Sequence, residues 1–119
     1  MLEVGVDIVK ISRIESLVAR FGEKGIAKFL NDDEMKIAKT PQRLAGFWAA
    51  KEACAKALKC GIGKELRFCD MWISKDKKGA PEIHLSAEKW EYFNLHSLSL
   101  SISHDGGFAI AVVAASLKN

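Results

Sequence analysis

The sequence predicts an α+β fold, in which helices pack on one side of a mainly antiparallel sheet. Three observations support this class. Apolar side chains alternate with a period of two near the N-terminus, over residues 2–9. A long segment, residues 41–59, carries apolar side chains at helical spacing. The last part of the chain holds two more strand patterns, which are joined by the turn Asp105-Gly106-Gly107.

Length and composition narrow the class further. The chain has 119 residues, which predicts one domain spanning residues 1–119. Hydrophobic residues make up 49% and charged residues 28%, with two prolines, so a disordered, collagen-like or low-complexity chain is excluded. No apolar run has the length of a membrane-spanning helix, and Glu3 stands where a signal peptide carries basic residues. We therefore expect a soluble, cytoplasmic protein.

The cysteines and the net charge agree with this expectation. The three cysteines form no CxxC pair, so neither a disulfide framework nor a zinc ribbon is expected at Cys54, Cys60 or Cys69. The net charge of +3 is mild. It suits an acidic partner or a phosphorylated small molecule, and it is too weak to indicate DNA binding by itself.

The first elements follow from alternation and caps. Leu2, Val4, Val6 and Ile8 alternate along a strand with one buried face, and Asp7 points to the other face, beside Gly5. A capping-box pattern, Ser12 with Glu15, predicts the start of a helix that ends at Gly22. Ile26, Phe29 and Leu30 suggest a short helical turn, and Asn31-Asp32 can cap one more.

The strongest helix signal covers residues 41–59. Thr40 can serve as N-cap and Pro41 as the first helical residue, and Gly61-Ile62-Gly63 ends the helix. One face collects the apolar side chains of Leu44, Phe47, Trp48, Cys54, Ala55 and Leu58.

The remaining segments read mainly as strands. Residues 68–74 and 80–85 flank a charged turn, and residues 86–90 can start a short helix. Residues 97–103 alternate serine with leucine or isoleucine, and residues 108–115 form an apolar final strand.

Few residues are candidates for chemistry. Asp7 is an acid in an apolar strand, either a water-facing strand-end group or a metal ligand or base. Glu52 and Lys56 share one helix face, either as a solvated ion pair or as a carboxylate for a metal with a lysine for phosphate. Lys51 projects into the apolar arc, so it either extends past its neighbours to solvent or pairs with a buried acid.

Two loop segments add weaker signals. Gly61 to Gly63 is a helix stop that could also let a ligand approach the backbone, and it has no phosphate-loop pattern. Ser103-His104-Asp105 is either a polar hairpin tip or a phosphate or acid–base group, and it is not a hydrolase triad. Two carboxylates without nearby cysteine or histidine ligands favour Mg²⁺. The residues alone thus indicate a Mg²⁺-dependent enzyme acting on a phosphorylated small molecule as one reading.

Several motifs together resemble one known family. Residues 5–14 resemble the GxDIVxIxRI opening of the holo-acyl carrier protein synthases, and residues 47–58 resemble their FxxKEAxxKAL motif. The segments Gly61-Ile62-Gly63, Gly79-Ala80-Pro81 and Ser101-Ile102-Ser103-His104 match further elements of the family in order. The resemblance covers essentially the whole chain, and it implies a 4′-phosphopantetheinyl transferase-like fold.

The resemblance also implies an activity in fatty acid biosynthesis. Such an enzyme transfers 4′-phosphopantetheine from coenzyme A to a serine of apo-acyl carrier protein and releases adenosine 3′,5′-bisphosphate. By motif, Asp7 and Glu52 would bind Mg²⁺, and Glu52 or a water held by the metal would take the serine proton. Lys56 would neutralise developing charge, and His104 would hold a phosphate of coenzyme A. The remaining implied contacts are Gly61 and Gly63 close to the coenzyme and Arg13 against the acidic carrier protein.

The resemblance has one departure, at Phe47, and it also implies an oligomeric state. Phe47 stands where many members carry an arginine, so Arg43 and Lys64 are candidate replacements for a contact with a coenzyme A phosphate. Small members of the family form homotrimers with active sites between neighbours. A chain of 119 residues would gain buried surface from the same assembly.

Three other functions compete with this reading. A transferase for polyketide or peptide-synthase carriers is usually about twice this length, with two pseudo-repeats. A small nucleic-acid-binding domain would need basic residues interleaved with exposed aromatics, whereas Phe47, Trp48 and Trp90 fit a core. A catalytically silent module that binds coenzyme A is the third alternative. Intact Asp7, Glu52 and Lys56 argue against it.

Overall fold

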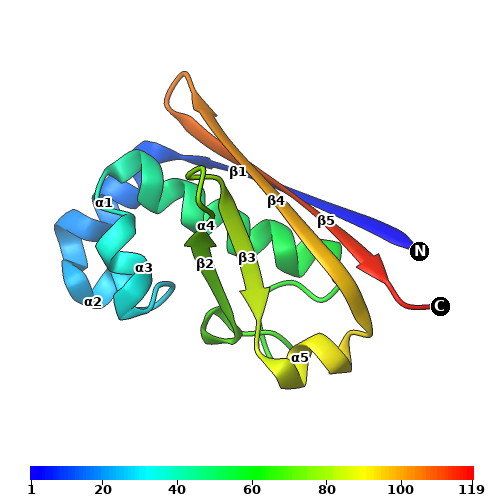
Figure 1. Cartoon of the computed structure of the whole chain (residues 1–119). Helices are drawn as coiled ribbons and strands as arrows, with labels where there is room; N and C mark the ends of the chain where they lie inside the picture. The colour runs from blue at the N-terminus through cyan, green and yellow to red at the C-terminus, as the bar shows by residue number, and fades with distance from the viewer.

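The computed structural model describes residues 1–119 and confirms the α+β class (Figure 1). A long helix, α4 (Pro41–Ala57), lies across one face of a three-stranded antiparallel sheet. The strand order is β1–β5–β4, with β1 (Leu2–Lys10), β4 (Leu95–Asp105) and β5 (Phe108–Leu117). A separate antiparallel pair is formed by β2 (Met71–Lys75) and β3 (Pro81–Leu85).

The short helices flank this layer. Three of them gather at the end of the sheet opposite the two chain termini, and α5 connects β3 to β4 (Figure 1). They are α1 (Ile11–Phe21), α2 (Glu23–Ile26), α3 (Asp32–Ile37) and α5 (Ala87–Tyr92). None of the helices is long and apolar enough to cross a membrane.

Local signals placed most helix starts correctly. The Thr40 hydroxyl accepts from the N–H of Arg43 at 3.2 Å, so the predicted start of α4 is confirmed. The expected box at Ser12 is wrong, because α1 begins at Ile11 after Lys10 and has no side-chain cap. Asn31 instead forms a complete capping box with Glu34, at the start of α3.

Two predicted boundaries also shift. The helix expected over residues 41–59 ends at Ala57, because Lys59 already has a positive φ of 66°. The strand expected to begin at residue 68 begins at Met71, after a 3₁₀ turn, η1 (Phe68–Asp70). The Asp70 carboxylate accepts from the N–H of Arg67 at 2.8 Å, which stabilises that turn.

The first strand buries the face opposite to the expected one. Gly5 and Val9 are buried beneath α4, whereas the apolar set Leu2, Val4, Val6 and Ile8 is more than half exposed. The reason is that α4 covers only one side of the sheet, and β1 presents its small and polar residues there. The other side has no covering element in this chain.

Close backbone contact fixes how α4 crosses the sheet. A Cβ at Gly46 would lie 2.8 Å from a methyl group of Ile102 in β4, so the N-terminal half of α4 lies on β4. A Cβ at Gly5 would overlap the backbone of Ala53 and Ala57, so the C-terminal half lies on β1. The two ends of α4 therefore present their side chains near opposite edges of the sheet.

Candidate active site

The site forms where β1 meets the C-terminal half of α4. The ammonium of Lys56 donates to the Asp7 carboxylate at 2.9 Å and to the Val6 carbonyl at 3.2 Å. The Asp7 side chain is 14% exposed and that of Lys56 is 52% exposed, so the pair lies at the surface with its acid end sheltered. Lys56 pairs with Asp7, so the solvated ion pair that the helix spacing suggested for Glu52 and Lys56 is replaced by this contact.

Glu52 lies beside this pair and is partly buried. Burial raises the pKa of the Glu52 carboxyl, and the negative charge of Asp7 raises it further. The positive charges of Lys56 and Arg13 oppose this rise. Two partly buried carboxylates that repel each other at one place give a position where added positive charge is favourable.

A magnesium ion fits this donor set. The site offers two carboxylates from Asp7 and Glu52, which are hard oxygen ligands. No group of three or more histidine, cysteine or acidic side chains forms a closed metal cage in this structure. Mg²⁺ usually keeps several waters and binds one or two carboxylates together with substrate phosphates, so an open two-carboxylate site suits it.

Arg13 extends the site on the side of α1. Its guanidinium lies 5.6 Å from the ring centroid of Trp48, as a cation–π contact. Trp48 precedes Glu52 by one helical turn, so both side chains face the same way on α4. Arg13 thus lies next to the carboxylates as well as in the first turn of α1.

His104 shares no cavity with the two carboxylates. It lines a cavity of about 190 Å³ near the N-terminal half of α4, and neither Asp7 nor Glu52 lines that cavity. Arg43 and Lys75 line it too, and no acidic side chain does. Of the two replacements expected for the family arginine at Phe47, Arg43 reaches this cavity and Lys64 does not. Lys75 gave no sequence signal, because it reads only as part of a charged turn.

The two glycines after α4 lie in a loop with free space around them. Gly61 has a φ of +67°, a conformation that favours glycine. A Cβ at Gly61 or at Gly63 would meet no other atom within 4 Å. The loop backbone is therefore accessible from outside, next to the helix end that carries Lys56.

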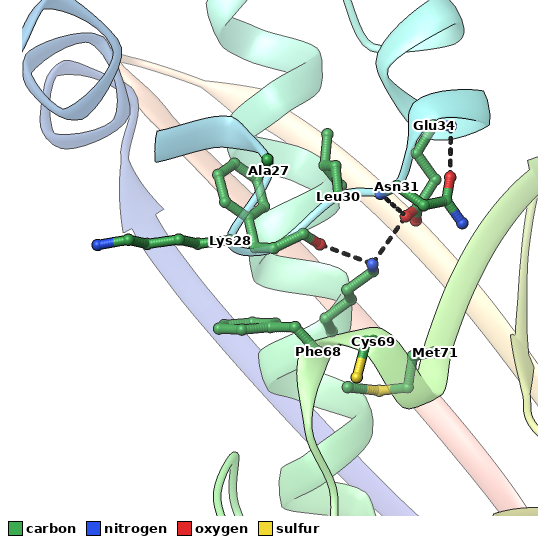
Figure 2. A pocket seen from close by; sticks show the side chains of 10 residues that line it. Ala27, Lys28, Leu30, Asn31, Glu34, Phe68, Cys69 and Met71 are labelled. Carbon is green, nitrogen blue, oxygen red and sulfur yellow. Dashed lines mark hydrogen bonds and ion pairs between the residues drawn. The ribbon is translucent and has the colours of Figure 1, made fainter. Parts of the chain in front are cut away.

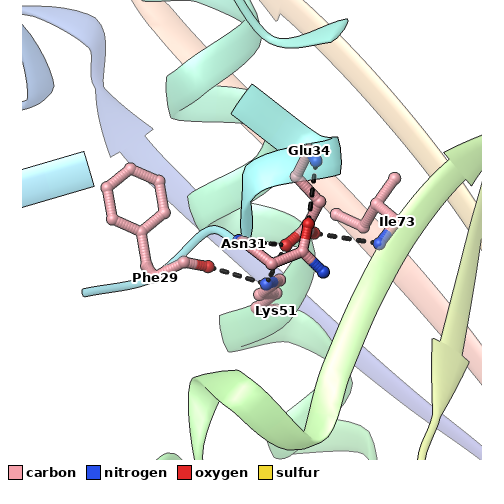
Figure 3. A network of polar contacts seen from close by, with 5 residues as sticks. All are labelled: Phe29, Asn31, Glu34, Lys51 and Ile73. Carbon is pink, nitrogen blue, oxygen red and sulfur yellow. Dashed lines mark hydrogen bonds and ion pairs between the residues drawn. The ribbon is translucent and has the colours of Figure 1, made fainter. Parts of the chain in front are cut away.

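Lys51 takes the second of its two expected roles and pairs with a buried acid. Figure 3 shows its ammonium between the carbonyl of Phe29 and the carboxylate of Glu34. Burial lowers the pKa of Lys51, and its hydrogen bond to Glu34 opposes this effect. Sequence spacing could not find this partner, which lies 17 residues earlier in the chain.

The sequence matches one family over most of its length. The model of the 4′-phosphopantetheinyl transferase superfamily matches residues 3–113. The chain belongs to this superfamily. Among its members, a holo-[acyl-carrier-protein] synthase of a Nitratiruptor species is 57% identical over 109 residues, 92% of this chain and 94% of that protein. A protein of the same name from Helicobacter pylori is 57% identical over 117 residues, 98% of this chain and 99% of that protein.

Solved structures agree with the sequence match. Helicobacter pylori holo-[acyl-carrier-protein] synthase in complex with coenzyme A superposes with a TM-score of 0.93 at 56% identity, covering 95% of this chain and 99% of that one. The synthase from Neisseria meningitidis gives 0.87 at 32% identity, with 96% and 97% covered. Fold and sequence therefore place the chain beside the same kind of enzyme.

Proposed function

We propose that this chain transfers the 4′-phosphopantetheine group from coenzyme A to a serine hydroxyl of apo-acyl carrier protein. The observation that carries the proposal is the meeting of Asp7, Glu52 and Lys56 at one point of a superfamily member. The serine oxygen forms a bond to the phosphorus that bears pantetheine. The bond from that phosphorus to the bridging oxygen breaks, and adenosine 3′,5′-bisphosphate leaves.

The three residues divide the work of this reaction. Asp7 and Glu52 would hold Mg²⁺, which would supply positive charge next to the pyrophosphate of coenzyme A. The Glu52 carboxylate, or a water that the metal holds, would accept the serine proton. Lys56, whose ammonium lies at the Asp7 carboxylate, would neutralise charge on the transferred phosphoryl group and the leaving group.

The nucleotide end of coenzyme A binds at the cavity that His104 lines. His104, Arg43 and Lys75 surround a space that has no acidic lining, which suits a phosphate monoester. The space around Gly61 and Gly63 is open, so coenzyme A can lie close to the backbone of these two residues. Phe47 is buried and lines the same cavity as His104, so the charge lost at that position is supplied by Arg43.

We expect the chain to assemble, with each active site between two neighbouring subunits. The carboxylates lie at the β1 end of α4, and the His104 cavity lies at its β4 end. A coenzyme A molecule then uses the carboxylates of one subunit and the basic cavity of its neighbour. A homotrimer provides this arrangement. The uncovered sheet face, formed by Leu2, Val4, Val6, Ile8, Phe108 and Val112, provides the apolar surface to bury.

The carrier protein docks on α1. Arg13 lies beside the site, and the exposed ring of Phe21 lies 5.2 Å from the cationic groups of both Arg20 and Lys28. A basic surface with an apolar centre suits the acidic recognition helix that the family's carriers present. The reaction takes place in the cytoplasm, in agreement with three free cysteines and no disulfide.

The test is the mass of the carrier protein. Purified protein is incubated with apo-acyl carrier protein, coenzyme A and Mg²⁺, with and without EDTA, and the carrier is weighed by mass spectrometry. We expect a gain of one phosphopantetheine arm that EDTA abolishes. If the carrier gains nothing while a control enzyme modifies it, the chain is a silent module that binds coenzyme A, and titration with coenzyme A becomes the next measurement.

A further inference from the structure

The buried pair of Lys51 and Glu34 is the charged group that the proposed reaction leaves unused. Both side chains are 1% exposed. The Lys51 ammonium donates to the Phe29 carbonyl at 2.6 Å and to Glu34 Oε1 at 2.9 Å. Glu34 accepts in addition from the N–H of Asn31 and from that of Ile73, both at 2.9 Å (Figure 3). One ion pair therefore ties α4 to the segment before α3, to α3 itself and to β2.

This pair is a poor choice if stability alone is required. Taking two charges out of water costs about as much as their attraction returns, and apolar residues of similar volume often do as well or better. Every buried side-chain donor and acceptor of the chain has a partner, so the pair is complete. Its complete hydrogen bonding gives one defined geometry, which an apolar contact would not specify.

The geometry that it defines leads to the active site. Phe29 is held by its carbonyl, and its ring packs edge-on against Trp48 with centroids 5.1 Å apart. Trp48 carries Arg13 at 5.6 Å on its ring, and it precedes Glu52 by one helical turn. Phe68 closes the same aromatic group, 5.1 Å from Trp48. Trp48, which lies next to Glu52 and contacts Arg13, therefore packs directly against the Phe29 ring.

The Phe29 ring is buried, and the backbone segment that carries it borders open space. A cavity of about 180 Å³ borders the segment Ala27 to Asn31, and it is also lined by Phe68, Cys69 and Lys51 (Figure 2). This space lets the segment move if its tether is lost. The bond from Lys51 to the Phe29 carbonyl is the one hydrogen bond that joins that backbone carbonyl to α4.

We infer that Lys51 is a positioning residue, which fixes Phe29 and through it the Trp48–Arg13 side of the site around Glu52. The inference rests on the proposed function, since it needs transfer as its readout. It assigns a role to Lys51, which directly precedes the proposed catalytic residue Glu52 on α4. A structural role alone would affect stability, whereas a positioning role also affects kcat.

The test separates the two roles with a pair of substitutions. Lys51→Met strands the Glu34 carboxylate, and Glu34→Gln strands the ammonium, so each single variant loses thermal stability. The double variant Lys51→Met with Glu34→Gln buries no charge, and we expect its unfolding temperature to return toward that of the native chain. Its kcat for phosphopantetheine transfer stays at least about tenfold low, with KM for coenzyme A unchanged, because the Phe29 tether is still missing.

Two further variants keep the result clear. Phe29→Leu keeps the Lys51 bond and removes the ring contact with Trp48, so kcat falls here as well. Leu95→Ala is the matched control, because Leu95 is fully buried at the start of β4, next to α5 and away from this group, so it lowers stability and leaves kcat unchanged. Native kcat in both the double variant and Phe29→Leu overturns the inference. Absence of transfer by the native chain instead refutes the proposed function.

Discussion

Gly5 of β1 lies so close to the backbone of Ala53 in α4 that no side chain fits between them. This contact sets the distance between the strand that carries Asp7 and the helix that carries Glu52 and Lys56. The active site therefore depends on a residue that has no side chain to offer. Its contribution is close approach of the backbones.

Substitution of Gly5 by alanine tests this contact. The added methyl group overlaps the carbonyl of Ala53 and the N–H of Ala57, so helix and strand must separate. We expect the free energy of unfolding to fall by about 3 kcal/mol or more. We also expect most of the transfer activity to be lost. Denaturant titration measures the loss of stability. Gly63→Ala is the control for stability, because a Cβ there meets no atom within 4 Å, and an equal loss of unfolding free energy in that variant would contradict the account.

Replacement of Glu52 by glutamine should abolish transfer and stabilise the metal-free fold. The folded-state pKa of Glu52 is raised, so the ionised carboxylate destabilises the fold at neutral pH, and this penalty fades as the pH falls through that pKa. Glu52→Gln removes the penalty. In EDTA we expect a higher unfolding temperature at pH 7 and no gain near pH 3. Glu91→Gln, which changes an exposed acid on α5, is the control, and a lower unfolding temperature for Glu52→Gln would contradict the prediction.

Removal of the Lys56 charge should affect both the pKa of Glu52 and the transfer rate. Lys56 lowers the pKa of Glu52, so Lys56→Met raises that pKa further. The transfer rate falls by about two to three orders of magnitude, as for loss of a group that stabilises transition-state charge. Carboxyl NMR titration of the metal-free protein reports the pKa. Lys59→Met, which instead breaks the contact of Lys59 with Glu3, should leave both quantities unchanged.

The basic cavity should discriminate the phosphate of the coenzyme. Arg43→Ala is expected to raise KM for coenzyme A by about tenfold and to leave KM for 3′-dephospho-coenzyme A nearly unchanged. Steady-state kinetics with the two substrates measures this difference. Lys64 lies outside the cavity, so Lys64→Ala serves as control. The reverse pattern, with Lys64 required and Arg43 dispensable, would refute our choice between the two.

The uncovered sheet face should hold the subunits together. Val6 is 54% exposed in the single chain and faces outward beside Val112. Val6→Asp places a charge on this face, so we expect a species near three times 13.1 kDa to become a monomer that transfers poorly. Light scattering after gel filtration measures the mass. Tyr92→Lys, at an exposed ring on α5, is the control. A native chain that is already monomeric would contradict the assembly.

Local patterns in the sequence predicted much of the fold. Helix starts with a polar cap, such as Thr40, depend on neighbours in the chain and were found. The buried face of β1 was assigned wrongly, because alternation identifies two faces and cannot say which one α4 covers. The outward face is apolar, so periodicity alone favours the wrong side.

The candidate site divides in the same way. Asp7, Glu52 and Lys56 were named from motifs, and the structure brings them together. The pairing of Lys56 with Asp7 was missed, because helix spacing offers Glu52 as the nearer partner. The partner of Lys51 was missed for a similar reason, since Glu34 reaches it only when α3 folds against α4. Contacts between distant segments leave no mark in the spacing of residues.

The most direct test compares the carrier mass produced by the native chain and by Asp7→Asn and Glu52→Gln. Each reaction contains apo-acyl carrier protein, coenzyme A and Mg²⁺, and circular dichroism first shows that all three proteins are folded. We predict that the native chain adds one phosphopantetheine arm to the carrier and that both variants add none in the same time. Transfer at the native rate by either variant would contradict the assignment of these two carboxylates as the reaction centre.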